Sequence, residues 1–187
     1  MKTVPYLAAM GSVMYLATTK CPDIAYTAGA LARFRSNPGI VHRNIVKHLL
    51  HYLQGTASHA LTYSLDNTSN EPFTTFSDAD HSGCKDSGWS TRGYIVKMGT
   101  GAISWSSKLQ KIITLSSTEA KYSAAVEARK EICWMRNLLS ELGFKSDEPS
   151  SLHIDKQSTI QVAKNPEHHG RMKQLDLKFF WLRDNVE

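Results

Sequence analysis

The sequence has few cysteines, no long apolar run and no strong excess of one charge. Its three cysteines, Cys21, Cys84 and Cys133, stand far apart, which argues against both a disulfide framework and a zinc cluster. No apolar stretch approaches the roughly 20 residues that span a membrane, and the N-terminus lacks the charged-then-apolar pattern of a signal peptide. These absences predict an intracellular protein with reduced thiols and no membrane partner.

The length and charge set broad limits on the organisation and the partner. A chain of 187 residues is long enough for one sizeable core, or for one domain with a smaller attachment. The formal net charge is +5, and this mild excess of Lys and Arg favours a polyanionic partner, because such residues release counterions when they neutralise phosphates.

Apolar residues recur at helical spacing through about the first 57 residues. Pro22 and Pro38-Gly39 divide this region into three predicted helices, and the third ends near Gly55. The third helix carries a basic face of five residues, His42, Arg43, Lys47, His48 and His51. A solvated face and a face that contacts nucleic-acid phosphates both remain open, whereas zinc at His48 and His51 lacks further ligands at metal-site spacing. The polar residues 58–70 predict a domain boundary.

After this boundary the period changes from helical to alternating. Strands are predicted at 73–77, 93–98 and 102–106, and such closely joined strands must be antiparallel. A long helix is then predicted from Ser116 to Gly143, followed by a strand over 151–155, a short helix over 157–164 and a last helix near the C-terminus.

Two acids occupy notable places in this pattern. Phe76 and Asp78 share one face of the first strand, so burial of Phe76 would carry Asp78 to the rim of a buried face, where a carboxylate needs a cation. Glu119 lies three residues before Tyr122, in line with the apolar stripe of the long helix. Taken alone, the first acid is also explained by ordinary turn chemistry, and the second by a capping box with Ser116.

Two further acids have comparable positions. Asp155 ends a strand just before a helix, where ligands bind in α/β sheets. Asp176 lies in the first turn of the last predicted helix. One shared cation site for Asp78, Glu119, Asp155 and Asp176 is a more economical explanation than four separate turns and caps.

The order of motifs in the chain resembles a known family. The motifs are FSDADHSG at 76–83, TRGYIVKMGTGAISWSS at 91–107, SSTEAKY at 116–122, IDKQSTI at 154–160 and HGRMKQLDLKFF at 169–180. In sequence and spacing they resemble the ribonuclease H domain of copia-type LTR retrotransposon Pol polyproteins. Residues 6–56 are similar to the thumb or connection region that follows the polymerase palm in the same polyproteins.

The resemblance implies an α/β fold, a ribonuclease H-like mixed five-stranded sheet flanked by helices, over 71–187. A helical reverse-transcriptase thumb or connection remnant would precede it over 1–60. The implied activity is metal-dependent cleavage of the RNA strand of RNA/DNA hybrids by two Mg²⁺ or Mn²⁺ ions. The implied metal ligands are Asp78, Glu119, Asp155 and Asp176, and oxygen ligands of this kind suit such ions.

Further roles follow from the same resemblance. His169 corresponds to a histidine that assists proton transfer or product release, and Gln157 to a residue that contacts the minor groove of the hybrid. Ser116 and Ser117 lie beside Glu119, while Lys108 and Arg171 are expected to contact phosphates, with a solvated role equally open. The implied partners are an RNA/DNA hybrid and the rest of a reverse transcriptase, in a cytoplasmic virus-like particle or in the nucleus.

The chain departs from the family pattern at four positions. His81 replaces an aromatic residue, Lys121 an acid, Lys156 an asparagine and Gln174 a histidine. A lysine beside a metal site competes electrostatically with the metal. A second hypothesis is therefore a catalytically inactive nucleic-acid-binding relic or a fragment of a decayed retrotransposon.

Overall fold

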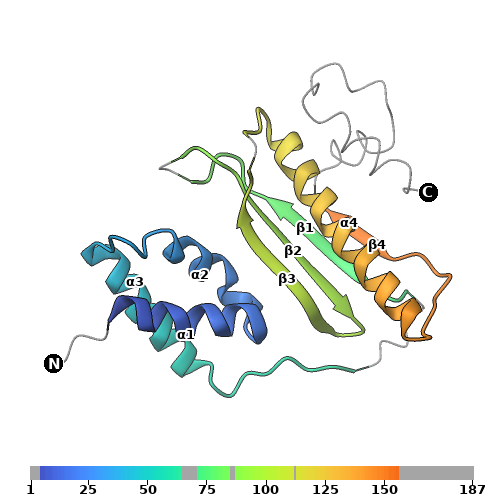
Figure 1. Cartoon of the computed structure of the whole chain (residues 1–187), viewed down its shortest axis with the longest axis horizontal. Helices are drawn as coiled ribbons and strands as arrows, with labels where there is room; N and C mark the ends of the chain where they lie inside the picture. The colour runs from blue at the N-terminus through green and yellow to red at the C-terminus, as the bar shows by residue number, and fades with distance from the viewer. Residues whose placement is uncertain (1–4, 65–70, 85–86, 112, 156–187) are drawn as a thin grey trace. The chain divides into compact units, whose positions relative to one another are not determined.

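A computed structural model of the chain describes residues 5–64, 71–84, 87–111 and 113–155. These residues have an α/β fold, as the sequence predicts (Figure 1). The chain divides into two compact units, the helical unit (residues 1–62) and the sheet unit (residues 63–187). No helix in the described ranges combines the length and the apolar character needed to cross a membrane.

Short helices make up the described part of the helical unit. They are α1 (Tyr6–Thr19), the 3₁₀ helix η1 (Pro22–Ile24), α2 (Ala25–Ala32) and α3 (Ile40–Gly55). Pro22 opens η1, where its missing N–H costs nothing. The backbone N–H of Gly39 donates to Nδ1 of His42 at 3.1 Å, and the His42 ring stacks on Phe34. The predicted helices and the end of the third at Gly55 are confirmed.

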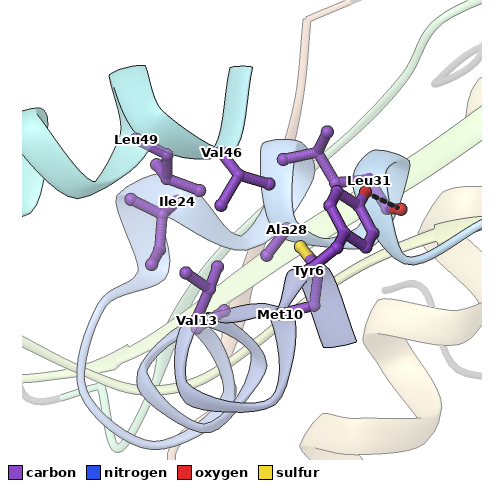
Figure 2. Packing of buried hydrophobic residues seen from close by; sticks show 9 residues of the cluster. Tyr6, Met10, Val13, Ile24, Ala28, Leu31, Val46 and Leu49 are labelled. Atoms are coloured by element: carbon purple, nitrogen blue, oxygen red, sulfur yellow. Dashed lines mark hydrogen bonds between the residues drawn. The ribbon is translucent and has the colours of Figure 1, made fainter. Parts of the chain in front are cut away.

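One apolar core joins these helices (Figure 2). Its buried residues are Tyr6, Met10, Val13, Ala17, Ile24, Ala28, Leu31, Val46 and Leu49. The hydroxyl of Tyr6 donates to the carbonyl of Leu31 at 2.9 Å, which satisfies the one polar group that Tyr6 brings into the core (Figure 2). The next residue of α1, Leu7, is 64% exposed, whereas Tyr6 faces the core.

The sheet unit is built on a mixed sheet. Its described strands are β1 (Thr74–Ala79), β2 (Thr91–Met98), β3 (Gly101–Leu109) and β4 (Ser151–Ile154), in the order β3-β2-β1-β4. The first three strands are antiparallel, as predicted, and β4 runs parallel to β1. Because the described residues form four strands, the five-stranded sheet implied by the resemblance is not confirmed.

Helix α4 (Ser117–Glu141) packs against β1, β2 and β4 (Figure 1). Its N-cap is Ser116, whose Oγ accepts a hydrogen bond from the N–H of Glu119 at 3.1 Å. Just past its last turn, Gly143 has φ of 85°, the left-handed conformation that glycine adopts without strain. The predicted start and end of this helix are confirmed.

The buried face of β1 differs from the face considered from the sequence. Phe73 packs with Val96 and with two residues of α4, and every second residue after it is buried. Phe76 and Asp78 do share a face, but it is the opposite one, where Phe76 is 43% exposed. The condition that Phe76 is buried is therefore not met, because Phe73 fills the space beneath α4. Asp78 lies on the exposed face.

Candidate active site

Two of the predicted acids are brought to the same end of the sheet. Strands β1 and β4 are parallel neighbours, and their register pairs Ser77 with Ile154. The next residues along the two strands are Asp78 and Asp155, so both carboxylates lie at the C-terminal ends of adjacent parallel strands. Ligands bind at this edge in α/β sheets.

Both carboxylates contact one cation, the ammonium of Lys121 near the start of α4. Its Nζ lies 2.9 Å from Oδ1 of Asp78 and also pairs with Oδ1 of Asp155. The Lys121 side chain is only 14% exposed, whereas the side chains of Asp78 and Asp155 are 68% and 65% exposed. The lysine therefore approaches from the protein side and leaves the carboxylates open to solvent.

The surroundings of Lys121 keep it charged. Burial by itself lowers the pKa of the ammonium, but hydrogen bonds to Asp155 and Asp78, together with their negative charges, outweigh this effect and raise the pKa above its usual 10.5. Oδ1 of Asp78 also accepts a hydrogen bond from the N–H of Ala79 at 2.8 Å, which fixes the orientation of this carboxylate. The site is thus an organised pair of anions around one positive charge.

The third predicted acid, Glu119, lies in the first turn of the same helix as Lys121. It is 5% exposed, which confirms that it lies in line with the buried stripe. Its Oε2 accepts a hydrogen bond from the N–H of Leu115 at 2.6 Å. The capping box expected with Ser116 is present on one side only, because the carboxylate binds the amide before Ser116 rather than that of Ser116.

The described acids do not by themselves form a complete metal centre. No three Asp, Glu, His or Cys side chains within the described ranges are arranged so that they could hold a metal ion. The fourth predicted ligand, Asp176, lies outside the described residues, as do the predicted site residues His169, Gln157 and Arg171.

Other predicted residues lie at the same end of the sheet. The register pairs Ala79 with Arg92 and Arg92 with Lys108, so exposed Lys108 lies level with the carboxylate edge, two strands away from β1. Arg92 pairs with Glu127 of α4 at 3.4 Å. Ser117 is the first residue of α4 and follows the N-cap Ser116.

Asp80 belongs to the connection between β1 and β2. Its N–H donates to the carbonyl of Thr91 at 3.1 Å, and its carboxylate accepts from the N–H of Thr91. Gly83 passes so close to this carboxylate that an added Cβ would overlap it. Asp80 therefore closes the end of the hairpin.

Sequence reasoning did not identify two features of this edge. The first is the double ion pair of Lys121, which appeared only as a departure from a family pattern. The second is the stacking of Phe76 on His153, with ring centroids 4.8 Å apart. For the stacking, the alternation of strand residues was the available signal. It places Phe76 on the same face as Asp78, and His153 on the same face as Asp155.

The basic face predicted on α3 is mostly solvated. Arg43, Lys47, His48 and His51 are exposed, whereas His42 is half-buried against Phe34. An exposed face of this kind is compatible with a solvated role and with phosphate contacts.

Comparison with known proteins relates the chain to retrotransposons. It is 41% identical over its full 187 residues to the retrovirus-related Pol polyprotein from transposon TNT 1-94 of Nicotiana tabacum, covering 14% of that polyprotein. It is 38% identical over 182 residues, 97% of the chain, to the Pol polyprotein from transposon RE1 of Arabidopsis thaliana, covering 12% of that polyprotein. It is also 42% identical over 135 residues, 72% of the chain, to secreted RxLR effector protein 161 of Plasmopara viticola, covering 94% of that protein.

No protein-family model and no solved structure matches the chain. The chain spans 14% and 12% of the length of the two Pol polyproteins to which it is compared. It aligns along its whole length with one of them, so both units are represented in the relatives. The homologues of this chain are therefore segments of copia-type retrotransposon Pol polyproteins.

Proposed function

We propose that this chain is the ribonuclease H segment of a retrotransposon Pol polyprotein and hydrolyses the RNA strand of RNA/DNA hybrids in a metal-dependent reaction. One observation carries the proposal. Asp78 and Asp155, from two parallel neighbouring strands, converge on a single cation at the end of the sheet where ligands bind. The similarity to retrotransposon Pol polyproteins also supports the proposal.

The described side chains fit a divalent cation in part. Two carboxylates that both reach the Lys121 ammonium can also reach one metal ion, and carboxylate oxygens are ligands that Mg²⁺ prefers. Bound at Asp78 and Asp155, with Glu119 and Asp176 completing the predicted set, Mg²⁺ or Mn²⁺ would make a water more acidic and stabilise the leaving oxygen.

The surroundings of the carboxylates also favour binding of a substrate. The exposed carboxylates leave room for a phosphodiester to approach, and Glu119 is held in place by the N–H of Leu115. In this proposal Lys108, level with the carboxylate edge, contacts a phosphate of the duplex and positions it. A requirement for RNA would come from contacts with 2′-hydroxyls across the wide minor groove.

The helical unit would contact the polymerase part of the polyprotein.

The proposal is tested with a panel of labelled duplexes. The purified chain is incubated with an RNA/DNA hybrid, double-stranded RNA and double-stranded DNA, in Mg²⁺, Mn²⁺ or EDTA. We expect cleavage of the RNA strand of the hybrid alone, and only with a metal. Equal cutting of all three duplexes would contradict hybrid specificity. Binding of the hybrid without cleavage under either metal would contradict the enzymatic proposal and support a nucleic-acid-binding module.

A further inference from the structure

Lys121 occupies the place that a metal ion would need. A cation bound by both Asp78 and Asp155 would lie between their carboxylates, and Nζ of Lys121 already pairs with Oδ1 of each. The lysine is part of α4, so its charge stays beside the carboxylates at a high effective concentration. A metal ion from solution therefore competes with a cation that cannot diffuse away.

The burial pattern leaves the two carboxylates accessible to an ion from solution. The two carboxylates face solvent, and the lysine side chain is largely covered. In the metal-free protein the ammonium also offsets the repulsion between two anions that the strand register holds side by side. The lysine thus stabilises the same geometry that a metal ion would use.

We propose that Lys121 is a tethered counter-ion of the candidate active site, which holds Asp78 and Asp155 together without metal and must be displaced before a divalent cation binds both of them. This inference rests on the proposed function, because it concerns the regulation of the same site by metal concentration. It makes Lys121 a positioning residue that weakens metal binding.

The test is direct binding of Mn²⁺ to the full chain, followed by the electron paramagnetic resonance signal of the unbound ion, which does not depend on cleavage. We expect Lys121→Met to bind Mn²⁺ about tenfold more tightly than the wild type, within the range of energetic coupling between neighbouring sites. Adding Asp78→Asn to Lys121→Met should abolish this gain, since one of the two ligands is then lost. An unchanged affinity in Lys121→Met would overturn the inference.

Two variants control for effects of packing and of general charge. Lys121→Arg keeps the positive charge and should bind Mn²⁺ as weakly as the wild type. Lys130→Met removes a lysine from the same helix that is 52% exposed and pairs with Glu127, three residues earlier in the helix, at 2.9 Å. This variant should leave the affinity unchanged. If Lys130→Met tightened binding as much as Lys121→Met, the effect would be one of net charge and the inference would fail.

Thermal unfolding in EDTA supplies a second readout. Lys121→Met should unfold at a lower temperature than the wild type, because the two carboxylates lose their shared cation, and saturating Mn²⁺ should raise its unfolding temperature more than that of the wild type. The opposite order of the two Mn²⁺ effects would contradict the proposal.

The inference and the proposed function can fail separately. Tighter Mn²⁺ binding by Lys121→Met with no cleavage of any hybrid would support the counter-ion role and contradict ribonuclease H activity. Suppose instead that the wild type cleaves the hybrid with a metal and that Lys121→Met has the same Mn²⁺ affinity as the wild type. This result would support ribonuclease H activity and contradict the counter-ion role.

Discussion

The two units of this chain bury different kinds of side chain. Within the described ranges, the buried residues of the helical unit are apolar, and its one buried hydroxyl, that of Tyr6, has a carbonyl partner. All the buried polar and charged residues in these ranges lie in the sheet unit: Thr75, Ser77, Ser90, Thr91, Gln110, Thr114, Glu119 and Ser123. Some of their atoms, such as Oγ1 of Thr75 and Oγ of Ser77, have no hydrogen-bond partner there.

This difference has an energetic consequence. Burial of an unpartnered hydroxyl costs free energy, and the described residues of the helical unit avoid this cost. The sheet unit accepts that cost beside the strand ends that carry Asp78 and Asp155. Sites with such local costs are where function is expected.

The largest effect expected is on the apolar part of the sheet unit. Phe73 is 1% exposed and packs with Val96 and with Ile132 of α4. Phe73→Ala should lower the free energy of unfolding of the sheet unit by ~3–5 kcal/mol. Hydrogen exchange should show loss of protection in α4 and no change in α1. Phe144→Ala, at a position that is 71% exposed, is the matched control, and equal loss of protection in both units would contradict the separation.

The helices and strands of both units could largely be predicted from the sequence alone. Helical spacing, Ser116 at a helix start and the alternating period of closely joined strands sufficed to predict the helices and the antiparallel strands. The sequence did not decide which face of β1 is buried, because Phe73 and Phe76 point to opposite faces. Packing of Phe73 against α4 decides between them.

The site was predictable in the same partial way. The placement of Asp78 and Asp155 at strand ends followed from the alternating pattern, and the structure brings them together through the parallel pairing of β1 with β4. The ion pairs of Lys121 depend on how α4 lies on the sheet, which no local pattern encodes.

A smaller effect is expected at the buried acid of the sheet unit. Glu119→Ala leaves the N–H of Leu115 without its acceptor, and the loss should be ~1–3 kcal/mol in chemical denaturation. Glu119→Gln keeps an acceptor oxygen and should cost less. Exposed Glu141, at the other end of α4, supplies the control Glu141→Ala. If Glu119→Gln and Glu119→Ala lowered the free energy of unfolding equally, the hydrogen bond from the N–H of Leu115 would not be the cause of the loss.

The smallest effect concerns the buried hydroxyl of Tyr6 in the helical unit. Tyr6→Phe removes the hydrogen bond to Leu31 and should cost ~0.5–1.5 kcal/mol. Burial raises the pKa of Tyr6 above 10.0, so the folded state favours the neutral phenol. Its contribution is complete below pH ~10 and is lost as the pH rises through the folded pKa.

Denaturation of wild type and Tyr6→Phe at neutral pH and above pH ~10 measures this contribution. The difference between the two proteins should shrink at the higher pH, where the phenol ionises. Tyr15→Phe, at a position that is 61% exposed, should change nothing at either pH. A difference that grows with pH would contradict the assignment.

We propose that the site around Asp78 and Asp155 cleaves the RNA strand of a hybrid. The most direct measurement is the rate of RNA-strand cleavage in Mg²⁺ by the wild type and by Asp78→Asn, prepared side by side. Our account predicts metal-dependent cutting by the wild type and a loss of about a hundredfold or more in the variant. Equal rates for the two proteins, or no cutting by the wild type, would contradict it.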